Sequence, residues 1–146
     1  MTRDLGLLIL RLAGLYLAVA HGWGKIVGLA SGETRFLEGV ERLGFPMPVA
    51  FAWAAALSEF LGGLAIALGL FARWAAPFAA FTMCVAAFGG HRALSQFLMW
   101  LGLVPASEEL KKWGNPELAF VYMLVCLAIA LLGPGRFSVD AKFGRK

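Results

Sequence analysis

The amino-acid sequence predicts an all-α membrane protein in which four transmembrane helices form an antiparallel bundle. The 146 residues are 60% hydrophobic with a mean hydropathy of +0.77, whereas soluble domains are only about 45–50% apolar. Four apolar runs approach the roughly 20 residues that a spanning helix needs. Glu59 lies near the middle of the second run, where a charge costs about 2.5–3.5 kcal/mol and is expected to face the bundle interior. The length corresponds to a single domain, residues 1–146.

The first predicted span covers residues 5–23. It contains Arg11 and lacks a small-residue cleavage site followed by a polar domain, so we interpret it as a span and not as a removable signal peptide. At about 100° per residue, one face of this helix collects its polar and small residues, namely Arg11, Gly14, Ala18, His21, Gly22 and Lys25.

The second predicted span covers residues 49–71 and follows a segment that is too polar to cross. Within that segment, residues 34–43 alternate apolar and charged positions, which is typical of a short amphipathic helix at the interface. One face of the second span carries Glu59, Gly62, Gly63, Ile66, Gly69 and Arg73. Small residues let helices approach closely in lipid, so the first two spans are expected to pack through Gly14, Gly22, Gly62, Gly63 and Gly69.

The third and fourth predicted spans, residues 74–90 and 118–133, are both short. Residues 93–104 between them are apolar enough to lie in the interface, so short interfacial helices are expected in the loops after the first and third spans. Asn115-Pro116-Glu117 predicts the start of the fourth span, with a cap, a proline and an acid in the first turn.

Four spans place both termini on the same side of the membrane. Lys and Arg divide six against six between the two sides, so their count gives no orientation, although the acidic residues opposite the termini favour cytoplasmic ends. The basic tail Lys142, Arg145 and Lys146 suits anionic lipid. No compact basic domain exists to dock on a duplex, so nucleic acid is excluded as a partner.

Six ionisable residues form the candidate binding site for a quinone or another polar ligand: Arg11, His21, Lys25, Glu59, His91 and Glu117. Glu59 is expected roughly 15 Å inside the face opposite the termini, and Arg11 about 5–8 Å deeper, so these two are expected to pair across the first two helices. Two interpretations stay open. The pair holds two helices in register, or it contributes to a site for a lipid-soluble polar head group or a proton relay.

Other chemistries have less support in the sequence. Two histidines and a carboxylate are one set that binds metals, but their spacing is no local motif, so neither a metal nor a tightly bound cofactor is predicted. The chain contains no phosphate-binding loop, dinucleotide fingerprint, zinc-protease helix or nucleophile elbow. Catalytic residues are therefore left unassigned. Cys84 and Cys126 form no CxxC motif, which indicates neither a disulfide framework nor a thiol-redox site.

An ordered set of motifs resembles the DoxX family. Each piece alone is weak, but the order is specific and covers nearly the whole chain: Arg11, His21-Gly22-Trp23-Gly24-Lys25, Gly44-Phe45-Pro46, Glu59-Phe60-Leu61-Gly62-Gly63, Gly69-Leu70-Phe71-Ala72-Arg73, Glu117-Leu118-Ala119 and Gly133-Pro134-Gly135-Arg136-Phe137-Ser138-Val139-Asp140. The segment from Ala93 to Asn115 is longer than in the plainest members.

The resemblance implies a small multi-pass protein of a bacterial or archaeal inner membrane, with both termini in the cytoplasm. It also implies a link to quinol oxidoreductase complexes or to membrane complexes that handle oxidative and thiol stress. We therefore expect a subunit or accessory of a quinone-linked oxidoreductase, and whether the chain is itself an enzyme is left open. The alternative is a non-catalytic anchor or scaffold for a partner enzyme. The expected partners are the lipid bilayer, a membrane or soluble oxidoreductase subunit, and a second copy of the chain.

Overall fold

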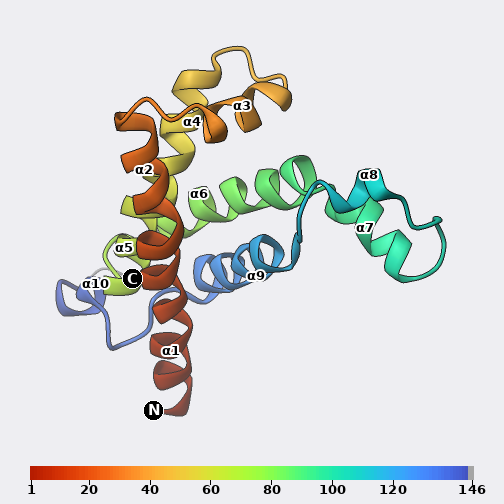
Figure 1. Cartoon of the computed structure of the whole chain (residues 1–146). Coiled ribbons are helices and arrows are strands. Elements are labelled where there is room, and N and C mark those ends of the chain that lie inside the picture. The colour runs from red at the N-terminus through yellow and green to blue at the C-terminus, as the bar shows by residue number, and fades with distance from the viewer. Residues whose placement is uncertain (145–146) are drawn as a thin grey trace.

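The computed structural model describes residues 1–144, apart from the side chain of Lys111. These residues form helices and no strand (Figure 1), which confirms the all-α class. The long helices are α1 (Thr2–Tyr16), η1 (Leu17–Gly22) and α2 (Trp23–Ala30); α4 (Pro48–Leu57), η2 (Ser58–Gly62) and α5 (Gly63–Leu68); α6 (Ala72–Cys84) and η3 (Val85–Gly90); and α9 (Glu117–Leu132), where η marks a π-helical segment. The short helices are α3 (Arg35–Arg42), α7 (Ala93–Trp100), α8 (Glu108–Lys111) and α10 (Val139–Lys142).

Two continuous helices are long and apolar enough to cross a membrane, namely Thr2–Ala30 and Pro48–Leu68. The first extends beyond the predicted residues 5–23. The second ends before residue 71 because Gly69 and Phe71 have φ angles of 66° and 47°, which a helix cannot continue through. The helix α9 is also apolar, but its 16 residues rise only about 24 Å.

The first two long helices run antiparallel and touch through their backbones (Figure 1). A Cβ on Gly14 would lie 2.7 Å from the carbonyl oxygen of Gly63, and a Cβ on Gly63 would lie 2.6 Å from that of Gly14. A Cβ on Gly22 would lie 2.5 Å from the backbone nitrogen of Phe60. Only glycine permits this approach, which fixes the register of the two helices.

The helices α6 and α9 pack against each other and lie across α1 instead of along it (Figure 1). Small side chains on one face of α6 allow this close contact, and the buried core of the pair consists of Ala72, Ala76, Ala79, Ala80 and Met83 from α6 with Tyr122, Cys126 and Ile129 from α9. Leu17 and Ile66 join the same cluster and so connect it to the first two helices.

Short helices lie in both loops where the sequence predicts them, α3 after the first long helix and α7 and α8 after the third. The segment after α9 returns to the start of α1, where Asp4 accepts a 3.0 Å hydrogen bond from the backbone nitrogen of Arg136. Asp140 accepts from the backbone nitrogens of Phe71 (2.9 Å) and Ala72 (3.1 Å). This carboxylate therefore caps the start of α6.

Candidate functional site

The predicted pair between Arg11 and Glu59 is wrong. Arg11 is 3% exposed and donates instead to backbone carbonyls. The contact between Gly14 and Gly63 explains why Arg11 and Glu59 do not meet. The two helices are antiparallel, so Arg11 lies three residues from this contact in one direction along the helix axis, and Glu59 lies four residues from it in the opposite direction. That offset is about 10 Å along the helix axis. The acceptors of Arg11 are Ile66 (3.0 Å), Ala67 (2.8 Å), Pro134 (3.0 Å) and Phe137 (2.7 Å).

Arg11 therefore has a structural role at the terminal end of the molecule. Two of its acceptors are carbonyls in the last turn of α5, where intrahelical donors run out, and that of Ile66 also accepts from the backbone nitrogen of Gly69 (3.0 Å). The other two belong to the turn at residues 134–137. One guanidinium thus ties α1, α5 and the segment after α9 together.

The partner of Glu59 is Lys25, whose Nζ donates to Glu59 Oε1 in an ion pair. Glu59 is 1% exposed, and the side chain of Lys25 is 26% exposed. The helix continues past Trp23 through α2, which brings Lys25 opposite η2. The other carboxylate oxygen, Glu59 Oε2, is buried and has no hydrogen-bond partner in the described part of the chain. This atom is an unused acceptor inside the protein.

A cavity of about 240 Å³ contains this pair, and all three π-helical segments of the described residues reach it. Segment η1 supplies His21, η2 supplies Glu59 and η3 supplies Ala86. Isolated π-helical turns are rare in proteins, and those that occur often lie at functional sites. The complete lining is Leu17, His21, Lys25, Glu59, Met83, Ala86, His91, Asn115, Leu118, Ala119 and Tyr122.

The histidines of the cavity are held in defined positions. The Nδ1 atom of His91 lies 2.6 Å from the carbonyl oxygen of Trp113. Because a carbonyl only accepts, Nδ1 must donate, which leaves Nε2 as an acceptor in the neutral ring. Gln96 is buried and donates to the carbonyls of His91 (2.7 Å) and Gly114 (2.6 Å). The ring of His21 meets the ring of Tyr122 edge-on, with centroids 5.9 Å apart.

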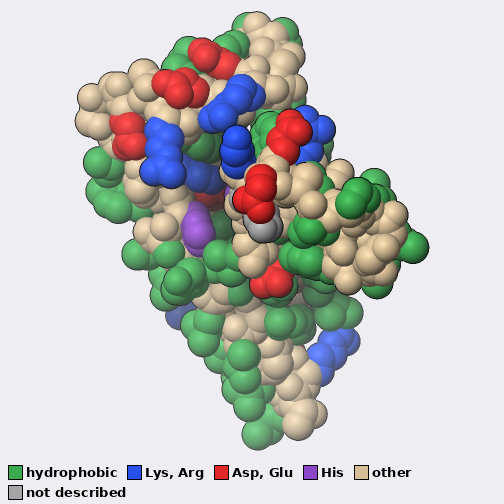
Figure 2. Space-filling model, turned by 45° about the vertical axis from the view of Figure 1, so that its right-hand side comes forward, with side chains coloured by type: hydrophobic (Ala, Val, Ile, Leu, Met, Phe, Trp, Pro, Cys, Tyr) green, Lys and Arg blue, Asp and Glu red, His purple; other side chains and the backbone are tan. Residues whose placement is uncertain are grey.

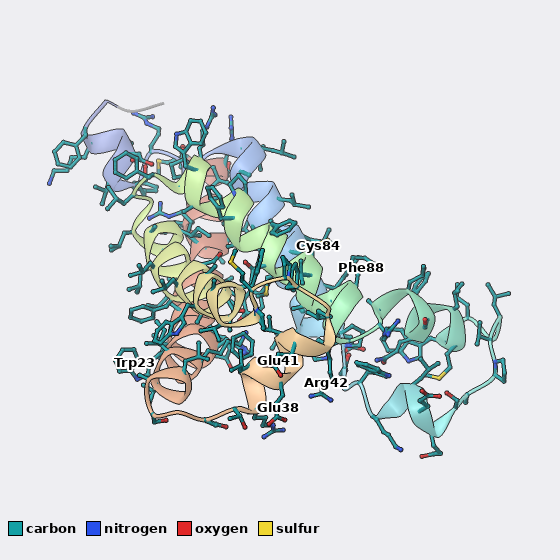
Figure 3. The ribbon with its side chains drawn as sticks, turned by 90° about the horizontal axis from the view of Figure 1, so that it is seen from above. Trp23, Glu38, Glu41, Arg42, Cys84 and Phe88 are labelled. Carbon is teal, nitrogen blue, oxygen red and sulfur yellow. The ribbon has the colours of Figure 1, made fainter. Side chains whose placement is uncertain are left out.

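A second, outer cavity of about 540 Å³ adjoins the first and shares Lys25, Ala86 and His91 with it. It lies among α2, α3, η3 and the loop before α9. Seen from above, α3 lies between α2 and η3 (Figure 3). Figure 2 shows lysine and arginine side chains around a hollow on this face, with a histidine below them. The inner cavity is therefore separated from the outer cavity at the polar end of the molecule only by side chains that line both.

The structure brings together four of the six predicted site residues, namely His21, Lys25, Glu59 and His91. Arg11 lies at the other end. Glu117 is exposed in the first turn of α9, where its backbone nitrogen donates to Asn115 Oδ1 (2.8 Å), and its side chain does not line the cavity. Sequence reasoning missed Tyr122, Asn115 and Met83 as lining residues. A tyrosine in an apolar helix looks like any core aromatic, so no local signal marked it.

Only some of the glycines that were predicted to pack the first two helices together lie at the contact between them. Gly14, Gly22 and Gly63 lie at the contact between the first two helices, while Gly69 lies against Ser138 and Arg11. Gly62 faces α6, where an added Cβ would meet nothing closer than 3.9 Å. Within the described residues, no three His, Cys, Asp or Glu side chains are grouped so as to hold a metal ion.

Two comparisons place the chain among known proteins. The family model described as DoxX matches residues 6–92. The "Inner membrane protein YphA" of Escherichia coli (strain K12) is 28% identical over 141 residues, which cover 96% of this chain and 91% of that protein. No solved structure matches the chain significantly.

Proposed function

The chain belongs to the DoxX family of membrane proteins, and on that premise we propose that its inner cavity binds the head group of a lipid-soluble quinol. In this proposal the chain is a subunit or accessory of a quinone-linked oxidoreductase of the inner membrane. The observation that carries the proposal is Glu59 Oε2, a buried acceptor without a partner.

The free acceptor supports a ligand that donates a hydrogen bond. Leaving a buried polar atom unsatisfied costs about 1–3 kcal/mol, and more for a charged group. The Lys25 ammonium satisfies only Oε1. A quinol presents hydroxyl donors, whereas both oxygens of a quinone are acceptors. The free Oε2, together with Nε2 of His91, therefore favours the reduced form of the ligand.

The size and lining of the cavity support a small aromatic head. Its volume of about 240 Å³ is below the roughly 300–1,000 Å³ of sites for drug-sized molecules. Leu17, Met83 and Leu118 provide apolar walls, and Tyr122 provides an aromatic edge. The ring of a quinol fits such a lining, with its isoprenoid tail left outside in lipid.

We also infer that four helices cross the membrane as two antiparallel pairs, with α6 and α9 lying across α1 (Figure 1), and that both termini are in the cytoplasm. The candidate spans Thr2–Ala30 and Pro48–Leu68 would be the first two, α6 with η3 would form the third, and α9 would form the fourth. These last two are short, and short spans are accommodated by local thinning of the bilayer. The relative YphA of Escherichia coli is an inner membrane protein, which supports the location.

The test is ligand retention in the full-length protein. We would purify wild-type, Glu59→Gln and Glu117→Gln chains in native-lipid discs, add a menaquinol or ubiquinol analogue under reducing conditions, and measure its affinity. Glu59→Gln should weaken binding by about ten- to a hundredfold, the worth of a hydrogen bond to a charged group. Glu117→Gln is the matched control because its carboxylate is exposed outside the cavity.

Equal affinity in all three chains would overturn the proposal. The alternative of a membrane anchor would be favoured if the wild-type chain bound no quinol and a soluble enzyme co-purified with it in stoichiometric amount.

A further inference from the structure

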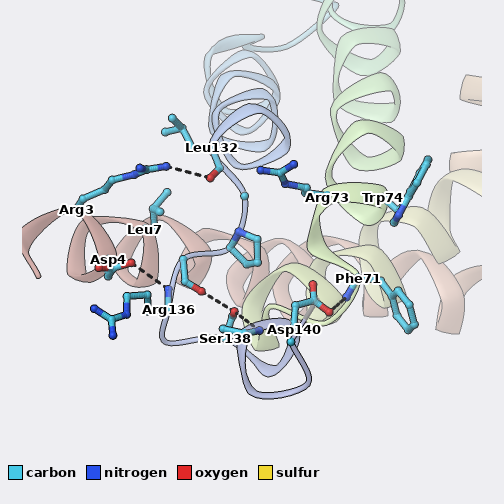
Figure 4. Close-up of a pocket in the computed structure, with 15 residues that line it drawn as sticks. Arg3, Asp4, Leu7, Phe71, Arg73, Trp74, Leu132, Arg136, Ser138 and Asp140 are labelled. Carbon is cyan, nitrogen blue, oxygen red and sulfur yellow. Dashed lines mark hydrogen bonds between the residues drawn. The ribbon is translucent and has the colours of Figure 1, made fainter. Parts of the chain in front are cut away.

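A separate cavity of about 990 Å³ lies at the opposite end of the molecule, beside the first turn of α1 and the helix α10. It forms where α1, the start of α6, the end of α9 and the segment at residues 133–141 meet. Figure 4 shows this cavity with its side chains. Three arginines line it, Arg3, Arg73 and Arg136, and all three are exposed.

The two acids of this cavity are already used by the backbone. Asp140 is buried and accepts from the backbone nitrogens of Phe71 and Ala72. Asp4 accepts from the backbone nitrogen of Arg136 at 3.0 Å. Neither carboxylate forms an ion pair with an arginine of the cavity.

In the described part of the chain none of the three arginines forms an ion pair with a carboxylate, although the charge of Asp4 acts on Arg3 and Arg136. Arg3 donates only to the carbonyl oxygen of Leu132, at 3.4 Å. Arg73 has its Nε 3.1 Å from the position that a Cβ on Gly133 would take. Figure 4 shows Arg3 and Arg73 on opposite sides of Leu132. Two guanidinium groups thus flank one opening, and guanidinium groups bind phosphate by paired hydrogen bonds.

An apolar track leads away from the same opening along α6. Trp74, Phe78 and Phe81 are spaced four and three residues apart, so they lie on one face of the helix. They are 74%, 68% and 65% exposed, and Trp74 also lines the cavity. Tryptophan is enriched where membrane meets water. Trp74 is therefore expected at the interface between membrane and water, and Phe78 and Phe81 in the hydrocarbon core of the bilayer.

We propose that this cavity binds an anionic phospholipid, with its phosphate between Arg3 and Arg73 and an acyl chain along Trp74, Phe78 and Phe81. Basic pockets between membrane helices on the cytoplasmic side bind anionic head groups. This site is distinct from the inner cavity: it lies at the other end of the molecule, and its ligand is recognised by charge.

The test uses the full-length protein in mild detergent with equimolar phosphatidylglycerol and phosphatidylcholine, and native mass spectrometry counts the lipids retained. The wild-type chain should retain phosphatidylglycerol in preference to phosphatidylcholine. Arg73→Gln should lower that retention about fivefold, and adding Arg3→Gln should lower it about fivefold again. Arg35→Gln, an exposed arginine at the other end on α3, should retain the lipid as wild type does.

Two further arms separate lipid from free phosphate. Phe78→Gln should weaken phosphatidylglycerol retention without changing the response to inorganic phosphate, because it alters only the apolar track. Equal retention of the two lipids, or an equal loss in Arg35→Gln, would overturn the site. Binding of inorganic phosphate that depends on Arg73, with no preference for phosphatidylglycerol, would overturn the assignment to a lipid.

Discussion

Lys25 and Glu59 form an ion pair that joins α2 to η2 beside the inner cavity. The lysine uses one carboxylate oxygen and leaves the other without a partner in the described residues. The ammonium makes the buried charge tolerable, while the second oxygen stays available to a ligand. Stability and binding at this pair can therefore be tested by different substitutions.

Lys25→Met should destabilise the protein because it leaves a buried carboxylate unpaired. Breaking a buried pair costs about 3–5 kcal/mol, and we expect the lower end because a quarter of the Lys25 side chain is exposed. The melting temperature in lipid discs measures this loss. The double variant Lys25→Met/Glu59→Gln should recover most of it, since no charge is then left alone. An unchanged melting temperature in Lys25→Met would contradict the pair.

Gly63→Ala should separate the first two long helices. The added methyl would lie 2.6 Å from the carbonyl oxygen of Gly14 and 3.0 Å from the Cβ of Ala18, and such overpacking costs about 1–3 kcal/mol. Gly62→Ala is the matched control, because its methyl would meet ordinary contacts at 3.9 Å and beyond. Thermal unfolding of both variants checks the register, and equal stability of the two would show that Gly63 does not face α1.

Arg11→Lys should loosen the terminal end although it keeps the charge. A lysine ammonium cannot reproduce the planar set of donors with which Arg11 reaches four carbonyls. Each lost charged hydrogen bond is worth about 1.5–3 kcal/mol. We expect faster proteolysis at the turn formed by residues 134–137, with Arg35→Lys as the control at an exposed site. Wild-type resistance in Arg11→Lys would argue against this role.

Tyr122→Phe should weaken quinol binding without affecting stability. The ring keeps its packing against His21, and the variant loses only the hydroxyl, which in the proposal would form a hydrogen bond with the quinol. One neutral hydrogen bond is worth about 0.5–1.5 kcal/mol, so affinity should fall about two- to tenfold. Measuring the affinity and the melting temperature together separates this outcome from misfolding, and unchanged affinity would remove Tyr122 from the site.

Accessibility of introduced cysteines should distinguish four spans from two. If α6 and α9 cross the membrane, Lys112→Cys lies on the side opposite the cytoplasm and should react with a membrane-impermeant thiol reagent in intact cells, whereas Arg136→Cys should react only after permeabilisation. The wild-type chain, with Cys84 and Cys126 inside the helices, is the control. Protection of both introduced cysteines in intact cells would favour two spans.

Hydrophobic patterning was enough to predict the class of this protein and the helix faces that carry its small and ionisable residues. The apolar runs predicted the long helices to within a few residues at most ends. The 3.6-residue period placed Gly14 with Gly22 and Glu59 with Gly63 on common faces. The Asn115-Pro116-Glu117 signal predicted the start of the last long helix with Asn115 as its cap, and the helix begins one residue later, at Glu117 with Pro116 as its N-cap. These features are local, since they depend on how one helix buries one face.

The pairing of those faces was decided only by the tertiary structure. Arg11 and Glu59 were expected to meet because their predicted depths differ by only about 5–8 Å, but the contact of Gly14 with Gly63 sets a register that separates them. The first helix continues through α2, which places Lys25 beside Glu59. The basic tail residues Arg145 and Lys146 lie outside the described residues. The π-helical turns and the position of Tyr122 had no signal in the sequence. By itself, the sequence determined which side chains each helix presents, because periodicity is a property of one helix. Which of these side chains meet depends on axial offsets of a few ångströms between neighbouring helices. Those offsets are fixed only when the helices pack, by the close backbone contacts that glycine permits.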